Sequence, residues 1–301
     1  MPITTGSHPK ALWPGVKAYF GKTYAEKPMV CDMVFDQKTS DKAYEDVVED
    51  TGFGLAPAKP EGNGVSYDTD KQGYVTRFTN TTYGLGAIIT KEAITDNQYE
   101  SVAQSKASKL ARSMRQTREN VHANILNRAF NSSYTGGDGK ELLATDHPTI
   151  DGTQANELSV AADFSEAALE DVLILIRQMK DSRGLRIQAS GVRVINPADL
   201  TFEVTRVLSS ANQSGTANND VNAMRDQGLL PGGSVTWDYL TDGDAWFVQT
   251  DVPEGLTTMN RWPMELTQDN DFDTDNARMK AVERYVAKWS DWRTLFGSPG
   301  A

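Results

Sequence analysis

Four aspartates occupy alternate positions near the C-terminus of the chain: Asp269, Asp271, Asp273 and Asp275. Closely spaced carboxylates are typical of calcium-binding loops, in which side-chain oxygens surround the ion. An EF-hand loop also requires glycine at its sixth position and glutamate at its twelfth. Whether the count starts at Asp269 or at Asp271, neither position holds the required residue. The run therefore favours a solvated turn between two strands, and we expect no metal ion here.

Glycines cluster between Gly136 and Lys140, a composition that phosphate-binding loops share. The Walker pattern places a glycine five residues before its second glycine, and a serine or threonine directly after its lysine. Tyr134 and Glu141 stand at those two positions. The stretch therefore predicts a turn, and we expect no nucleotide or other cofactor.

Residues that could act as a nucleophile or a general base are few. The chain has three histidines, one cysteine (Cys31) and no G-x-S-x-G sequence. His147 lies between Asp146 and Pro148 with no recognisable nucleophile motif, and His122 falls in a helical pattern that favours a surface or packing role. We expect no catalytic residue and no enzymatic activity. A carbohydrate-active hydrolase with paired carboxylates stays open as a minor alternative, since sequence does not show carboxylate separation.

Composition places the chain among folded proteins and argues against two classes of partner. The 301 residues are 39% hydrophobic and 24% charged, with a net charge of −11. Such acidity argues against a protein whose role is to neutralise nucleic-acid phosphate. No apolar run approaches the roughly 20 residues that span a bilayer, so no membrane contact is expected. The lone cysteine excludes an intrachain disulfide and favours synthesis in a reducing cytosol.

One long helix is predicted between positions 98 and 130, where no proline or glycine interrupts the chain. Apolar residues recur there at helical spacing, and at about 1.5 Å per residue the helix would cross the whole molecule. Six basic residues lie on it: Lys106, Lys109, Arg112, Arg115, Arg118 and Arg128. Two interpretations stay open for these charges, a solvated surface or contact with acidic neighbours or a polyanion.

A long two-limbed β segment precedes that helix. We expect its first limb at 44–53, a tip rich in proline and glycine at 56–64, and a return limb at 65–70 and 73–83. A hairpin of this length has no core of its own and exposes unpaired edges. A soluble monomer would avoid such an arm, whereas a protein built to lie across its neighbours requires it.

Residues 1–40 have the pattern of an arm, in which four prolines are expected to prevent any regular element. Trp13 and Tyr19 are costly to leave in water, which favours docking of this arm on another surface.

The rest of the chain alternates strands and helices. We expect helices at 165–183 and 198–209, and strands at 84–90, 192–197, 234–240, 245–250, 264–268 and 278–291. Asp242-Gly243 predicts a hairpin turn between two of these strands, and the polar residues at 211–233 predict a mobile loop.

This order of parts, together with local sequence, resembles the HK97-type major capsid proteins of tailed phages. Gly139–Pro148 is similar to the G-K-x-L-x-x-x-x-H-P passage of Mu-like major head subunits. Their strand-helix-loop segment is similar to Val194–Leu200 and Gly215–Asn222. Their C-terminal strands are similar to Gln268–Asp275, Glu283–Tyr285 and Trp289–Arg293.

The resemblance implies an α+β protein with the HK97-like capsid fold. Its parts would be an N-terminal arm at 1–40, an extended β-hairpin or E-loop at 41–92, a P domain with the spine helix at 93–156, an A domain at 157–260 and return strands of the P domain at 261–301. Copies would form hexamers and pentamers of an icosahedral virion shell around double-stranded DNA, assembled in the host cytoplasm.

The resemblance also implies partners. The chain would contact itself, a separate scaffold protein, a portal, a decoration protein and, without sequence specificity, the packaged DNA. Residues expected at contacts between subunits are Trp13, Tyr19, Pro57, Lys59, Glu61, Arg77, Arg112 and Arg115. Lys59 and Lys71 are candidates for a covalent crosslink by location only. An encapsulin-type, non-viral shell protein of the same fold is the main alternative.

Overall fold

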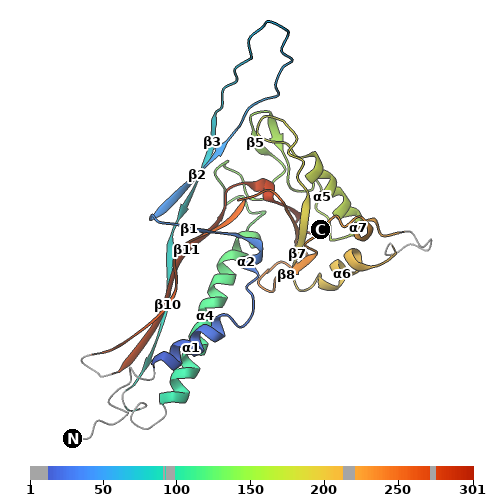
Figure 1. Cartoon of the computed structure of the whole chain (residues 1–301). Helices are drawn as coiled ribbons and strands as arrows, with labels where there is room; N and C mark the ends of the chain where they lie inside the picture. Colours follow the sequence, from blue (N-terminus) through green and yellow to red (C-terminus); the bar gives the residue numbers. More distant parts are fainter. Residues whose placement is uncertain (1–12, 91, 93–98, 213–220, 272–275) are drawn as a thin grey trace.

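The structure, a computed structural model, describes residues 13–90, 92, 99–212, 221–271 and 276–301. It mixes helices and strands, as the α+β prediction requires. Figure 1 shows an elongated molecule in which a long sheet and two helices form one side, a second lobe lies beside their upper end, and a hairpin projects beyond both. The chain is therefore not a self-contained ball.

A four-stranded sheet, in the order β1-β10-β11-β4, forms the long part of the molecule. Its strands are β1 (Asp36–Thr39), β4 (Thr81–Ile89), β10 (Leu256–Asn270) and β11 (Ala277–Trp289). β11 runs antiparallel to both of its neighbours, β10 and β4, and β1 joins β10 in parallel. The paired strands predicted at 264–268 and 278–291 are confirmed, and so is the apolar strand at 84–90.

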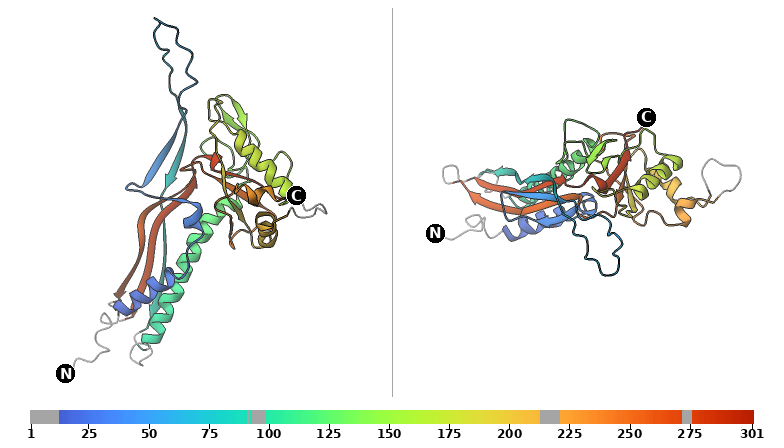
Figure 2. Two further views of the ribbon diagram at one scale, coloured as in Figure 1. Left: turned by 45° about the vertical axis from the view of Figure 1, so that its right-hand side comes forward. Right: turned by 90° about the horizontal axis from the view of Figure 1, so that it is seen from above.

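Two helices pack on one face of this sheet, α1 (Trp13–Tyr24) and α4 (Tyr99–Asn127). Figure 2 shows both lying along the sheet. α4 confirms the uninterrupted helix predicted at 98–130, and its Leu110 and Met114 pack with Leu266 and Met279 of the sheet. The expectation of no regular element in residues 1–40 is wrong, because α1 forms there. Pro14 does not prevent it, since the first helical turn needs no N–H partner.

The predicted hairpin is present as β2 (Tyr44–Asp50) and β3 (Gln72–Thr79), paired antiparallel. Both strands are shorter than the predicted limbs. Residues 51–71, here called the extension, continue beyond the paired strands without regular secondary structure and form the thin loop at the top of Figure 1. Four glycines and two prolines between positions 52 and 64 explain the loss of strand pairing.

The second lobe contains another four-stranded sheet, in the order β12-β9-β7-β8. Its strands are β7 (Gly191–Asn196), β8 (Ser234–Thr236), β9 (Trp246–Thr250) and β12 (Leu295–Ser298). The hairpin predicted at Asp242-Gly243 is wrong, because β8 and β9 pair with opposite sides of β7. The chain leaves β8 at Trp237, which is buried and donates its indole N–H to Glu119 at 3.0 Å. The last strand, β12, pairs with β9, so the end of the chain belongs to this lobe.

Short elements complete the second lobe and its junction with the long sheet. They are α2 (Cys31–Val34), β5 (His147–Thr149), β6 (Gly152–Gln154), α5 (Glu166–Gln178), α6 (Thr201–Ser209), α7 (Ala223–Asp226) and η3 (Trp292–Thr294). α5 starts at the predicted cap, where Ser165 accepts the N–H of Ala168. It ends earlier than predicted, because the Asp181 carboxylate accepts the N–H groups of Arg183 and Leu185 and holds a turn. Part of the loop predicted to be mobile, 213–220, lies outside the described residues.

Two apolar clusters hold the subunit together. The larger joins the C-terminal half of α4 to the second lobe, and the smaller lies between α1, α4 and the long sheet. No residue of the extension, all of which the structure describes, belongs to either cluster. The extension therefore adds nothing to the apolar cores of its own subunit.

Candidate functional site

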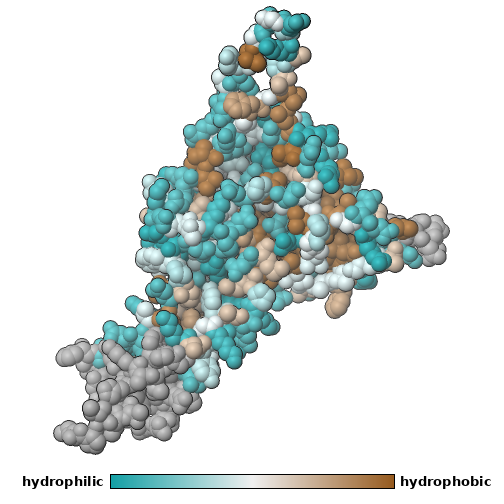
Figure 3. All heavy atoms as spheres, viewed as in Figure 1, coloured by the Kyte–Doolittle hydropathy of each residue, from teal (hydrophilic) through white to brown (hydrophobic). Residues whose placement is uncertain are grey.

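The extension exposes four large apolar side chains. The exposed fractions are 63% for Phe53, 82% for Leu55, 63% for Val65 and 94% for Tyr67. Figure 3 shows hydrophobic side chains along the projecting hairpin among polar ones. Side chains of this size are usually buried, and a group of them in solvent marks a surface for another protein. The extension therefore has the properties of an arm that packs on a neighbouring molecule.

Contacts at the base of the extension set its direction. The Arg183 guanidinium of the second lobe lies 2.6 Å from the Asp68 carboxylate and also donates to the Thr69 carbonyl. The N–H groups of Gly54 and Thr69 donate to Asp68 and, with Arg183, lower the pKa of its carboxyl. Glu49 of β2 accepts the Ser182 hydroxyl of the same lobe. These contacts hold the hairpin to the second lobe near the base of the extension.

Arg183→Ala is expected to loosen the extension without unfolding the subunit. The variant loses the contacts to Asp68 and Thr69, which lie at the surface, so the thermal midpoint should change little. Proteolytic cleavage within 51–71 should be at least about threefold faster, because cleavage reports local opening. Arg112→Ala, an exposed arginine far from the hairpin, is the control. Equal cleavage rates in both variants would contradict the proposed clamp.

The predicted contact residues of the tip and of the arm lie at the surface where the structure describes them. Pro57, Lys59 and Glu61 are exposed in the extension, and Tyr19 is 47% exposed on α1. Trp13 begins α1, but its side chain lies outside the described part of the structure. Their roles between subunits stay predictions.

The three predicted arginines contact segments of their own chain. Arg77 makes a bidentate ion pair with Asp46 across the hairpin and lies over the Tyr44 ring. Arg112 lies 3.9 Å from Glu26, and Arg115 donates to the Pro28 carbonyl. The first contact joins the two strands of the hairpin, and the other two join the segment after α1 to the spine helix.

The second face of the long sheet carries exposed apolar side chains among the residues that the structure describes. Trp262 of β10 lies opposite Arg284 of β11, whose guanidinium covers the indole ring, and Ile88 of β4 lies opposite Arg278. Trp262 is 47% exposed and Ile88 60% exposed. A sheet face with apolar side chains in solvent is a second surface suited to another protein.

A buried hydrogen-bond network centres on Asn156, a residue that the sequence did not single out. Its amide N–H groups lie within 3.1 Å of the carbonyls of Leu142, Trp292 and Leu295. Its side-chain oxygen accepts from the N–H of Ala144 and lies 3.0 Å from Nε2 of His147. The side chain thus ties the turn after α4 to the end of the chain.

His147 is part of the same network. Its Nδ1 lies 2.6 Å from the Asp138 carboxylate, and its ring stacks on Trp292 with 4.3 Å between centroids. The turn predicted at 136–140 is confirmed, since the Gly136 N–H donates to the Lys140 carbonyl at 2.7 Å. The glycine-rich turn and the histidine therefore have a structural role.

A second buried polar cluster joins α4 to the sheet. The spine arginine Arg118, expected at the surface, is buried; it donates to Gln37 and Asn260 and lies 3.5 Å from the Glu283 carboxylate. Burial raises the pKa of the Glu283 carboxyl to about 7, although the arginine opposes this shift. His122 is buried as well, and the surface alternative for it is wrong.

Acid pH is expected to destabilise the subunit through His122. Its Nδ1 donates to the Arg118 carbonyl and its Nε2 accepts the Thr258 hydroxyl, so the neutral ring fits the site. Burial lowers the pKa of His122 from 6.5 to about 4. Between these two values the imidazole is protonated in the unfolded chain and neutral in the folded chain. The free energy of unfolding therefore falls as the pH drops from 6.5 to about 4. The loss is about 3 kcal/mol at most.

Urea unfolding of unassembled subunits between these pH values measures this effect. Glu283 has the opposite effect on stability. Because its pKa is raised in the folded chain, its contribution to the free energy of unfolding falls as the pH rises from 4.5 to about 7. The difference between wild type and His122→Gln isolates the histidine. A difference that does not vary with pH would contradict the assignment.

Two kinds of feature are absent from the described residues. Within the described ranges, no three His, Cys, Asp or Glu side chains gather as metal ligands would. No described helix is long and apolar enough to cross a bilayer. Of the four alternating aspartates, Asp273 and Asp275 lie outside the described residues.

A projecting arm and a sheet face with exposed apolar side chains, together with a spine helix on a long sheet, define a subunit of a larger assembly. A family model described as phage capsid protein matches residues 73–297, and the chain belongs to this family. It is a major capsid protein, a structural protein of the virion that associates with itself into a shell. No curated protein matches the chain.

Solved structures of similar fold cover nearly the whole chain. The virus-like particle from Pyrococcus furiosus is 10% identical, with a TM-score of 0.51, and the match covers 95% of this chain and 98% of that one. The procapsid of bacteriophage JBD30 is 16% identical over 98% and 76% of the two chains, with a TM-score of 0.51. The capsid of an empty GTA particle is 11% identical over 93% and 97%, with a TM-score of 0.55. The predicted HK97-like capsid fold is confirmed.

Proposed function

We propose that this capsid protein builds an icosahedral shell from hexamers and pentamers and that the shell encloses double-stranded DNA. The observation that carries the proposal is the extension, which exposes Leu55 and Tyr67 while both cores of the subunit close without it. A closed shell made from one chain needs contacts between unlike surfaces that repeat around an axis. Arms that reach several neighbours multiply weak contacts into a stable whole.

The parts of the chain take distinct roles in this proposal. Residues 1–40 form the arm, 41–92 the hairpin over a neighbour, 93–156 the P domain with its spine, and 157–260 the A domain near the axis. Residues 261–301 return to the P domain up to the end of β11, and β12 adds to the sheet of the A domain.

The proposal includes partners and a place of assembly. Subunits assemble in the host cytoplasm with a separate scaffold protein, a portal and a decoration protein. The chain acts without catalysis, cofactor or membrane contact. Its net charge of −11 supports loose, non-specific contact with the packaged DNA.

Expression of the chain, alone and with its scaffold protein, tests the proposal. Sedimentation and electron microscopy should show closed particles with five-fold vertices. Particles recovered from infected cells should contain DNA that resists nuclease until the shell is opened. A stable monomer under all these conditions would contradict the proposal.

A second candidate is an encapsulin-type compartment of the same fold. The similarity in fold to the virus-like particle from Pyrococcus furiosus supports this candidate, since the match spans nearly all of both chains. Such a shell would assemble without scaffold and enclose protein cargo. Purified particles that hold a co-purified enzyme and no DNA would support this alternative over the phage head.

A further inference from the structure

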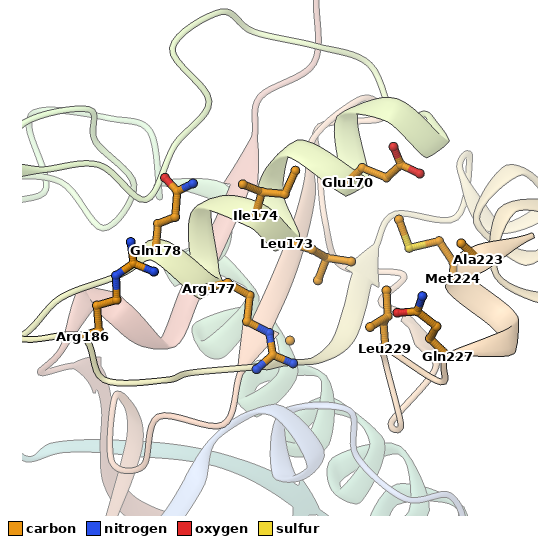
Figure 4. A pocket seen from close by; sticks show the side chains of 11 residues that line it. Glu170, Leu173, Ile174, Arg177, Gln178, Arg186, Ala223, Met224, Gln227 and Leu229 are labelled. Carbon is orange, nitrogen blue, oxygen red and sulfur yellow. The ribbon is translucent and has the colours of Figure 1, made fainter.

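A groove of about 480 Å³ lies on the second lobe, between α5 and the chain around α7. Its apolar lining includes Leu173 and Ile174 of α5, and Met224 and Leu229 from the facing segment. Figure 4 shows Leu173 and Arg177 directed from α5 toward that segment. Ile174 is 54% exposed at the rim, so the groove opens to solvent with an apolar wall.

Two arginines give the groove a positive charge. Arg177 and Arg186 line it, both are exposed, and within the described ranges neither has a carboxylate at ion-pair distance. One carboxylate, Glu170, lies elsewhere in the lining. Guanidinium groups bind carboxylates strongly when both are taken out of water. The groove therefore fits an apolar side chain accompanied by acidic groups.

An exposed helix carries this combination. Phe202, near the start of α6, is 78% exposed. Asp199 and Glu203, both exposed, stand close to it in sequence. A phenyl ring in water with carboxylates beside it is the chemical complement of the groove.

The start of α6 lies away from the groove of its own subunit. Gly191, at the first residue of β7, lines the groove. Thr201, at the start of α6, lies 3.2 Å from Thr236, which pairs with Asn196 at the last residue of β7. The two ends of β7 are about 17 Å apart at the usual rise per residue. Phe202 therefore lies near the end of β7 opposite to Gly191, and α6 meets the α7 wall of the groove through its last turn, where the Val207 carbonyl accepts from Asn222.

We propose that Phe202 of one subunit enters the α5–α7 groove of the next, with Glu203 facing Arg177 and Asp199 facing Arg186. The inference rests on the proposed shell function. Because the two surfaces differ, the contact runs head to tail, and its repetition closes a ring of subunits. The contact thus names one of the interfaces that hold a hexamer or a pentamer together.

Disulfide trapping tests the contact directly in assembled shells. The variant carries Ile174→Cys and Phe202→Cys, both at exposed positions, and the native Cys31 is buried. Oxidised shells should give a ladder of linked subunits that ends at five or six and holds at least about half of the chains, since a disulfide needs the two Cα atoms within about 7 Å. Val160→Cys with Phe202→Cys is the control and should stay unlinked.

Charge reversal gives a second measurement. Arg177→Glu and Glu203→Arg should each lower shell yield at least about tenfold, because each brings like charges together in the contact. The double variant should recover the yield to within about threefold of wild type, because every interface again pairs opposite charges. Each subunit should keep its wild-type thermal midpoint, since both residues are exposed.

The outcomes separate this contact from the shell function. Shells of normal yield whose cysteine pair stays unlinked would overturn the contact and leave the proposed function intact. A variant with Ile174→Cys and Leu55→Cys tests the competing occupant. A disulfide between subunits in this variant would overturn the contact as well, because the groove would then hold the extension. A wild-type chain that remains a monomer would overturn both.

Discussion

Replacing Leu55 and Tyr67 together by serine is expected to prevent shell formation while leaving the subunit folded. Both side chains lie almost entirely in solvent and belong to neither apolar core. Burying a large apolar side chain contributes about 1.5–3 kcal/mol, and in a shell this gain recurs at every subunit. Particle yield should therefore fall at least about tenfold, which corresponds to only about 1.4 kcal/mol per contact. Sedimentation of the assembly mixture measures it.

Polar substitutions in the same extension provide the matched control. Asn63→Ser with Ser66→Ala changes two exposed residues of the extension without removing apolar surface. This variant should assemble normally. Replacing residues 57–63 by two glycines should abolish assembly even more completely, because the arm then becomes too short to reach its neighbour. Normal yield of the Leu55 and Tyr67 variant, with an unchanged thermal midpoint, would show that the extension has no role between subunits.

Asn156→Ala is expected to destabilise the subunit more than any surface change. The variant leaves the Ala144 N–H and the carbonyls of Leu142, Trp292 and Leu295 without their partner in a buried site. Each unsatisfied buried group costs about 1–3 kcal/mol, so a total loss of about 3–5 kcal/mol follows after partial relaxation. Urea unfolding of unassembled subunits should show this loss or no folded protein at all.

Asn120→Ala is the matched control for this prediction. Asn120 is exposed on α4 and donates to the Gln116 carbonyl one turn earlier. Its loss should change the free energy of unfolding by less than about 0.5 kcal/mol. If the two asparagine variants lose similar stability, the network around Asn156 does not hold the two ends of the fold together.

Local sequence signals predicted the elements that form by local rules. The spine helix was predictable because residues 98–130 combine helical spacing with the absence of proline and glycine. The hairpin was predictable from the composition of its tip. α1 was missed because Pro14 counted as a breaker, although it stands in the first turn of the helix. The turn at Asp242-Gly243 was misassigned because β7 offers both neighbouring strands a better partner.

The site residues show the same contrast between what local sequence signals predict and what distant partners determine. The tip residues Pro57, Lys59 and Glu61 were predicted to contact neighbouring subunits because they lie at the turn-rich tip; they are exposed, and their contact role stays a prediction. Leu55 and Tyr67 were not singled out, because the limbs were expected to pair as strands up to the tip. The four glycines between positions 52 and 64 could have indicated unpaired chain. Asn156 gave no local signal, since its partner Trp292 lies 136 residues away.

The central claim is that this chain buries its remaining apolar surface only against copies of itself. An electron-microscopy reconstruction of the assembled shell tests it most directly, at a resolution that shows side chains. We predict that Phe53, Leu55, Val65 and Tyr67 of each subunit lose most of their exposed area against a neighbouring copy. A closed shell in which the extension folds back on its own subunit, or points into solvent, would contradict the account.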